Sequence, residues 1–192
     1  RSATTYCHCR HSPSPVTLYF GPPAGVSDVF SGSISGHGSL VINGPGEQTL
    51  SGPSTFTGGV TLNGGTLAIG NATALGTGNF TINFGDIDST TGSTTLTTTP
   101  IVLNTSLLSY DGTGNLSLGN GTLTFGSQDF NVNVAGNTLT LGGTRLGQGN
   151  LAKLGSGTLV LSGNNQASGS NITDITIAGG TLAFTNANQL GP

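Results

Sequence analysis

Pairs of apolar residues two positions apart recur along the chain at intervals of roughly 20 residues, and Gly or Asn follows most of them. Alternation at period two places both members of a pair on one face of a short strand. A second series of pairs interleaves with the first, so each interval holds two or three strands. The pairs are Leu40/Ile42, Val60/Leu62, Leu67/Ile69, Ile82/Phe84, Leu116/Leu118, Leu123/Phe125, Val132/Val134, Leu139/Leu141, Leu159/Leu161, Ile175/Ile177 and Leu182/Phe184.

The turns between these strands leave two all-β architectures open. Asn43-Gly44, Asn63-Gly64 and Asn120-Gly121 supply residues that tolerate positive φ. Asn-Gly between alternating runs is typical of β-hairpins, which are the main alternative. The regular interval favours a solenoid instead, in which each strand pairs in parallel with its counterpart in the next coil, about 4.8 Å away. We therefore predict a right-handed parallel β-helix with almost no helix content.

Composition excludes several other classes of protein. Gly provides 34 of the 192 residues without a Gly-X-Y period, and 33% of the residues are hydrophobic in ordered patterns, which argues against collagen and disorder. Charged residues make up 6%, and the basic ones are Arg1, Arg10, Arg145 and Lys153. So few cations predict no nucleic-acid partner and no polybasic membrane patch. No apolar stretch is long enough for a membrane-spanning helix.

Residues 1–25 differ in composition from the rest of the chain. They hold both cysteines, Cys7 and Cys9, and four prolines, which disfavour a regular strand ladder. We predict an irregular lead-in, cap or tail over 1–25 and a β-helix over 26–192. Because no start methionine or signal-peptide pattern is present, the chain is expected to be a mature product or a piece of a longer protein.

Two segments of the chain match each other residue by residue, with four extra residues inside the second. This match indicates an internal duplication. In the first segment the shared residues are Leu50-Ser51-Gly52, Gly64-Gly65-Thr66-Leu67-Ala68, Asn71-Ala72 and Leu75-Gly76. In the second they are Leu161-Ser162-Gly163, Gly179-Gly180-Thr181-Leu182-Ala183, Asn186-Ala187 and Leu190-Gly191.

These segments, residues 48–76 and 157–191, resemble the passenger-associated transport repeat of bacterial autotransporters. The first keeps Thr55-Phe56-Thr57-Gly58-Gly59-Val60, whereas Gln166-Ala167-Ser168-Gly169-Ser170 departs from the pattern in the second. The resemblance implies a β-helical passenger that is exported through the outer membrane by a C-terminal barrel. It also implies that the repeat assists export and folding. No barrel sequence occurs in the 192 residues.

The sharpest enzymatic hypothesis concerns Asp86 and Asp88, which share one face of an extended segment, with Asp111 approaching from a neighbouring coil. Paired carboxylates can cleave glycosidic bonds or hold calcium. The sequence offers few partners for such chemistry, because Glu47 is the sole Glu and the calcium-binding Gly-Gly-X-Gly-X-Asp repeat is absent. We interpret the segment as a solvated loop and predict no catalytic residue.

Other candidate sites receive structural interpretations as well. Cys7, His8, Cys9 and His11 are spaced too tightly for common zinc sites, and His37 lies in a Gly-His-Gly turn. We predict no metal site and no cofactor. Tyr110, beside Asp111, is left open as a residue that could line a glycan groove. The phenylalanines are assigned to the core stack or to coil corners, namely Phe20, Phe30, Phe56, Phe80, Phe84, Phe125, Phe130 and Phe184.

The functional prediction is therefore structural rather than enzymatic. We expect a stalk or adhesin segment of an autotransporter-type secreted protein, located outside the cell or on the bacterial surface. The alternatives are a filament subunit that self-associates through its open coil ends and a module that binds a glycan through Thr and Asn ladders. An environmental or host glycan or protein is the expected partner.

Overall fold

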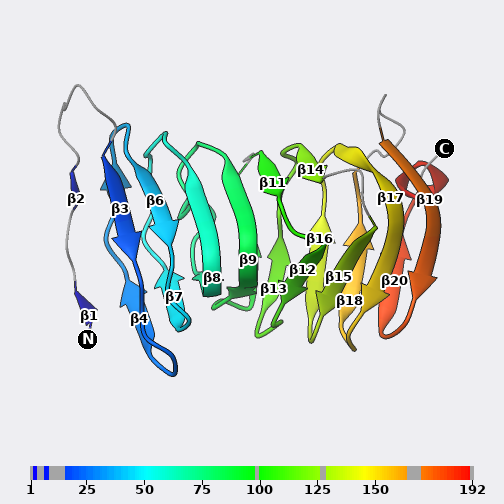
Figure 1. Cartoon of the computed structure of the whole chain (residues 1–192), viewed down its shortest axis with the longest axis horizontal. Helices are drawn as coiled ribbons and strands as arrows, with labels where there is room; N and C mark the ends of the chain where they lie inside the picture. The colour runs from blue at the N-terminus through cyan, green and yellow to red at the C-terminus, as the bar shows by residue number, and fades with distance from the viewer. Residues whose placement is uncertain are drawn as a thin grey trace.

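The computed structural model describes residues 2–3, 7–8, 16–97, 100–125, 129–163 and 170–190. They form an elongated stack of coils, with the two ends of the chain at opposite ends of the stack (Figure 1). Each coil visits three faces in turn, and neighbouring coils pair strand to strand. The strands form sheets of 13, five and two strands.

Three faces run along the stack, and long strands join the first face to the second. The first face contains β3 (Thr17–Phe20), β6 (Ser39–Ile42), the first halves of β8 (Val60–Ile69) and β9 (Phe80–Ser89), β11 (Ile101–Leu103), β14 (Leu123–Phe125) and the first parts of β17 (Arg145–Leu154) and β19 (Ser170–Ile177). The second face contains β1 (Ser2–Ala3), β4 (Ser27–Phe30), β7 (Glu47–Leu50), the second halves of β8 and β9, β12 (Leu107–Tyr110), β15 (Phe130–Val134) and the second parts of β17 and β19. The third face contains β2 (Cys7–His8), β5 (Ile34–Ser35), β10 (Ser93–Thr95), β13 (Asn115–Ser117), β16 (Thr138–Leu141), β18 (Thr158–Leu161) and β20 (Thr181–Phe184).

Every strand pairing in the described residues is parallel, which confirms the predicted parallel β-helix. Leu40 pairs with Val60 and Val60 with Phe80, so these coils are 20 residues long, whereas Leu108 pairs with Val132 in a coil of 24. The one helical element among the described residues is the 3-10 turn Ala187–Gln189. Hairpins, the rejected alternative, would have given antiparallel pairs.

A continuous apolar core fills the space between the faces. On the first face Leu40, Val60, Phe80, Ile101 and Leu123 lie at matching positions, and each is at most 3% exposed. The core is maintained across the third face where strands are interrupted, because Phe56, Ala74 and Leu75 are buried there. Each coil therefore buries its inner side chains against its two neighbours.

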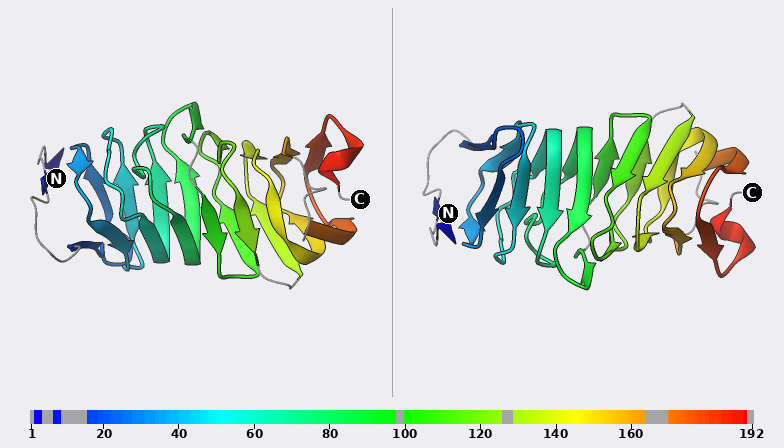
Figure 2. Two further views of the ribbon diagram at one scale, coloured as in Figure 1. Left: turned by 90° about the horizontal axis from the view of Figure 1, so that it is seen from above. Right: turned by 90° about the horizontal axis from the view of Figure 1, so that it is seen from below.

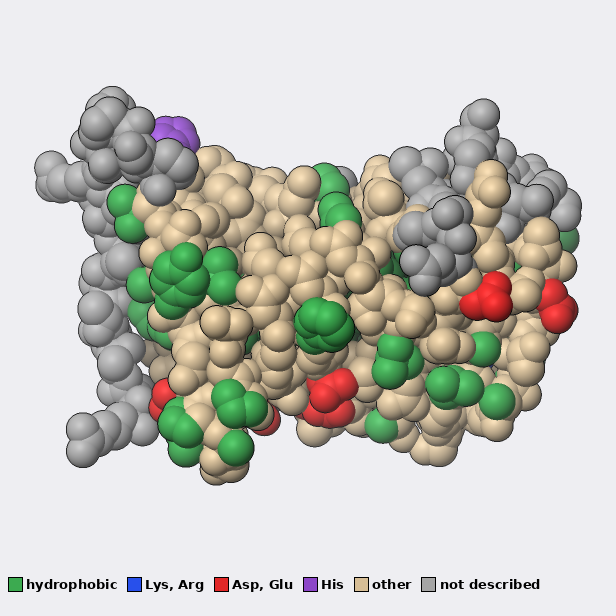
Figure 3. Space-filling view, in the orientation of Figure 1, with side chains coloured by type: hydrophobic (Ala, Val, Ile, Leu, Met, Phe, Trp, Pro, Cys, Tyr) green, Lys and Arg blue, Asp and Glu red, His purple; other side chains and the backbone are tan. Residues whose placement is uncertain are grey.

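Outward positions of the first face carry Thr and Asn, and they form a side-chain ladder at the corner to the second face. The amide of Asn83 donates from Nδ2 to Oδ1 of Asn63 at 2.7 Å, and Asn104 donates in the same way to Asn83 at 2.8 Å. In this asparagine ladder the side-chain amides of successive coils satisfy one another's hydrogen-bonding groups at the corner. The face shown in Figure 3 carries acidic side chains (red) among uncharged ones, and no Lys or Arg side chain (blue) is visible on it.

Phe84 does not share the buried face of Ile82, as the predicted pair Ile82/Phe84 required, because the structure leaves it 69% exposed at a corner. The register shifts beside Asn63, and Asn63 pairs with Phe84 instead of with Asn83. Gly85 then takes φ +102°, so the in-out alternation assumed for Ile82/Phe84 does not hold across this corner. Phe184 is also 47% exposed, whereas Phe56, Phe80, Phe125 and Phe130 are buried as predicted.

Stacking also reaches into residues 1–25, for which the sequence predicted an irregular lead-in, cap or tail. Thr17–Phe20 (β3) pairs in register with Ser39–Ile42 (β6), and Leu18 and Phe20 pack against the core.

The described residues include no helix long and apolar enough to cross a membrane.

Candidate functional site

Asp86 and Asp88 both lie on strand β9, which corrects the predicted solvated loop, and the structure gives them different environments. Asp88 is only 5% exposed. Its Oδ1 accepts a hydrogen bond from the backbone N of Thr113 at 3.0 Å, and its Oδ2 accepts one from Oγ1 of the same residue at 2.6 Å. Asp86 is half-buried. With both oxygens engaged, Asp88 holds the turn that follows β12 rather than facing a substrate.

Asp111 approaches this pair from the neighbouring coil, as the sequence analysis expected. Its backbone N donates to the carbonyl of Ile87 at 3.1 Å. Partial burial raises the pKa of its carboxyl, and the carboxylates of Asp86, Asp88 and Glu47 raise it further. Four acidic residues therefore lie close together, and we name Glu47, Asp86, Asp88 and Asp111 the acidic cluster.

Glu47 joins the cluster through strand register, which the sequence analysis did not use. It pairs with Thr66 on the next coil, and Thr66 pairs with Asp86 on the one after. Counting coil lengths from the apolar pairs could have placed Glu47 and Asp86 in one outward row. Among the described residues, no group of three or more His, Cys, Asp or Glu side chains is arranged to hold a metal ion. The acidic cluster supplies negative potential to one surface of the second face.

Tyr110 does not line a groove, which corrects the hypothesis of a glycan contact there. The side chain is 0% exposed, and its hydroxyl donates to the carbonyl oxygen of Gly114 at 2.5 Å. Burial raises the pKa of the phenol well above its usual range, and the charges of Asp88 and Asp111 add to the shift. Tyr110 is thus a core residue that closes the corner between the second and third faces.

The histidines and cysteines contribute no assembled site within the described residues. His37 is in an exposed hydrogen bond, with Nδ1 3.2 Å from Oγ1 of Thr57. Cys7 and His8 are placed only as backbone in β2, opposite Ile34 and Ser35. Cys9 and His11, the other members of that candidate group, lie outside the described residues.

Lys153 is a buried residue that the sequence analysis counted only as a rare basic side chain. It is 0% exposed and lies on β17 between Val132 and Ile177 of the adjacent coils. Its Nζ donates to the backbone carbonyls of Leu154 at 2.5 Å, Gly155 at 2.9 Å and Gly179 at 3.2 Å. Burial lowers the pKa of this amine. Its spacing of two from Leu151 was the available signal, since that spacing places it on the inward side of the strand.

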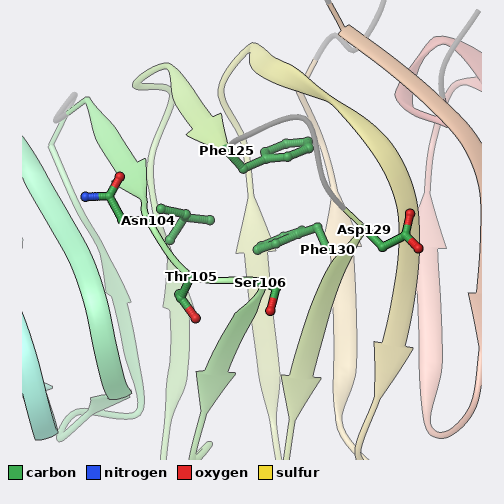
Figure 4. Close-up of a pocket in the computed structure, with 7 residues that line it drawn as sticks. Asn104, Thr105, Ser106, Phe125, Asp129 and Phe130 are labelled. Atoms are coloured by element: carbon green, nitrogen blue, oxygen red, sulfur yellow. The ribbon is translucent and has the colours of Figure 1, made fainter.

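A cavity of about 280 Å³ opens at the corner between the first and second faces, where the strands are interrupted (Figure 4). In Figure 4 the rings of Phe125 and Phe130 lie one over the other beside the cavity, whereas the labelled polar side chains project away from these rings. The ring centroids are 5.0 Å apart, with an interplanar angle of 13°. The lining residues are Leu103, Asn104, Thr105, Ser106, Phe125, Asp129 and Phe130. The polar groups do not converge on one point as they do in a small-molecule site.

Comparison with known proteins identifies the duplicated segments. The family described as Passenger-associated-transport-repeat matches residues 40–69 and 151–184. Both ranges start and end earlier than the predicted copies at 48–76 and 157–191. No curated protein and no solved structure matches the chain significantly.

The two matched ranges follow the same path but start on different faces. The first begins on β6 of the first face and ends on β8 of the second. The second begins on β17 of the second face and ends on β20 of the third. The repeat therefore encodes a course of successive strands and corners, and the second copy follows that course from one face further on.

Corner geometry supports this equivalence. Gly65 has φ +67° and Gly180 has φ +64°. A Cβ on Gly65 would lie 2.2 Å from the Gly46 oxygen, and one on Gly180 would lie 2.2 Å from the Gly157 oxygen. Transport repeats of this kind are typical of secreted or cell-surface proteins. Two matches to this repeat on a parallel β-helix indicate an autotransporter passenger-type β-helix.

Proposed function

We propose that the chain is a rigid stalk or adhesin segment of a surface-exposed passenger, which supports export and displays other parts of the protein. The observation that carries the proposal is the uninterrupted stacking of coils around one apolar core. Strand pairs connect β3, β6, β8, β9, β11, β14, β17 and β19 in sequence along the first face.

Stacking of this kind supports a mechanical role. Each coil contacts only its neighbours, so stiffness comes from the sum of similar interfaces along the axis. The views from above and below in Figure 2 show one continuous stack without a break between subdomains. A chain with 6% charged residues suits display more than electrostatic capture of a ligand.

Size-exclusion chromatography with light scattering, followed by small-angle X-ray scattering, tests the mechanical part of the proposal. A stiff stalk segment should elute as a monomer whose scattering fits a straight rod. A flexible or compact scattering profile would contradict it. Ordered fibres in the same samples would favour the alternative of a filament subunit.

Export is tested by surface display of the intact passenger with an N-terminal epitope tag. Leu62→Asn places an amide in the core, where Leu62 is 0% exposed, and should sharply reduce the surface-accessible epitope. Thr61→Asn, on the outward side of the same strand, is the matched control and should leave display unchanged. Equal display of the two variants would show that export does not depend on this fold.

A further inference from the structure

Lys153 links two successive coils through backbone carbonyls alone. Leu154 and Gly155 belong to its own coil, whereas Gly179 belongs to the next one. No carboxylate is among its hydrogen-bond partners in the described residues. We infer that Lys153 fixes the stacking register of the second transport repeat, because its buried ammonium has its full set of acceptors only when the Gly179 corner lies directly over Gly155.

Burial makes the choice of register costly to violate. Removing an ammonium from water is strongly unfavourable unless hydrogen-bond acceptors replace the water. Gly179 is positioned by its own close contact, because a Cβ placed on it would lie 3.0 Å from the Gly155 oxygen. The backbone N of Ala178 also donates to the carbonyl of Lys153 at 2.9 Å. A sliding movement of the last coil would remove the Gly179 oxygen from the ammonium.

The rest of the core gives little protection against such sliding. Leu108 and Val132, both buried, occupy the equivalent positions in the preceding coils, and Ile177, which is 54% exposed, occupies the equivalent position in the next coil. Side chains of such similar size and polarity pack almost equally well against one another in several alignments. A shift of two residues also preserves the in-out alternation, so the apolar pattern alone does not oppose it. A single buried polar group is a known means of selecting one register.

The first repeat shows that the lysine is not needed to fill space. The aligned segments Leu40–Leu50 and Leu151–Leu161 place Ile42 where the second repeat has Lys153. Ile42 is 0% exposed and lies beneath the equivalent corner, where Gly65 packs over Gly44 and Gly46. An apolar side chain is therefore compatible with this corner, and the ammonium contributes selectivity between registers.

Disulfide trapping tests the inference on the third face, where Thr158 pairs with Thr181 in the native register. With Cys7 and Cys9 replaced by Ser, the pair Thr158→Cys/Thr181→Cys reports the native register. The pair Thr158→Cys/Ala183→Cys reports a two-residue slip. With Lys153 present, we expect rapid cross-linking of the native pair alone. In Lys153→Ile, the slipped pair should cross-link at least five-fold more than it does with Lys153 present.

Nuclear magnetic resonance of the protein refolded from urea gives a second readout. Lys153→Ile should keep its thermal midpoint within a few degrees but show more than one set of amide signals for β18 and β20. The control Ile42→Leu should show one set. A single set of signals in Lys153→Ile, with no slipped cross-link, would overturn the inference. So would failure of both Lys153→Ile and Lys153→Met to fold, because the lysine would then be needed for stability itself.

Discussion

The two transport repeats share a corner and differ in what lies beneath and around it. In both, a Gly with positive φ packs over a Gly-X-Gly turn of the preceding coil, and the following Thr donates its backbone N to that turn. Thr66 donates to Gly46 at 3.1 Å, and Thr181 donates to Gly157 at 3.1 Å. The core position below is Ile42 in one copy and Lys153 in the other. Local backbone chemistry is thus held constant while the core side chain varies.

Burial provides a second difference between the copies. Leu67 is 0% exposed, whereas its counterpart Leu182 is only partly buried. Described coils lie on both sides of the first repeat, but the second repeat ends on the last described coil. A repeat therefore owes much of its stability to its neighbours, as expected for a one-dimensional stack.

Truncation of the matched leucines should give the largest difference. Leu67→Ala leaves a cavity between two coils and should lower the free energy of unfolding by about 3 kcal/mol, against about 1 kcal/mol for Leu182→Ala. Urea titrations followed by circular dichroism measure both. Equal losses would mean that the second repeat is as fully packed as the first, contrary to the exposure of Leu182.

Corner glycines test the shared feature. Gly65→Ala and Gly180→Ala each force a Cβ against backbone oxygens at positive φ, and each should cost about 2–3 kcal/mol. Gly92→Ala is the control, since no atom lies within 4 Å of its added Cβ, and it should change stability by less than about 0.5 kcal/mol. If only one of the two substitutions lowered the free energy of unfolding by this amount, the two corners would not be structurally equivalent.

Among the described residues, the asparagine ladder lies in the coils around the first repeat. Asn83→Ala removes both ladder hydrogen bonds and should cost about 1–2 kcal/mol, again measured by urea titration. Thr81→Ala on the outward side of the same strand is the control and should have little effect. If the two variants unfold at the same urea concentration, the ladder contributes nothing to the difference between the copies.

Acid repulsion should produce the smallest effect. Of the acidic cluster, Glu47 lies within the first repeat, and Thr158 stands at the equivalent position of the second. Asp111 has a raised pKa in the folded state, so its penalty is fully present above that pKa and fades as the pH falls toward the unfolded value. Asp111→Asn should stabilise the protein at neutral pH by a few tenths of a kcal/mol. It should also flatten the dependence of unfolding on pH, which urea titrations across the acidic range would show.

Sequence periodicity was sufficient to predict the architecture because every coil repeats the same physical requirement. Pairs such as Leu40/Ile42 and Leu159/Leu161 are both buried, and their parallel pairing follows from the interval between them. The duplicated motif likewise predicted the family found by comparison.

The errors occurred at corners and where contacts between coils determine whether a side chain is buried. Phe84 faces outward because the strand shifts register at Asn63, and no local pattern indicates that shift. Tyr110 and Lys153 are buried because backbone carbonyls of nearby turns accept their hydrogen bonds. Such acceptors exist only once the coils have stacked, so residue type alone could not place these two side chains in the core.

Because the repeats are offset by one face, each repeat has its own direction around the axis of the stack as well as its own position along it. A motif that starts at Leu40 on the first face and again at Leu151 on the second presents its outer surface in two different directions. Insertion or deletion of a single strand and corner would rotate everything beyond it by one face and leave the rise per coil unchanged. Changes in chain length between repeats could thus change the direction in which the distal coils present their outer surface, while the rise per coil stays the same.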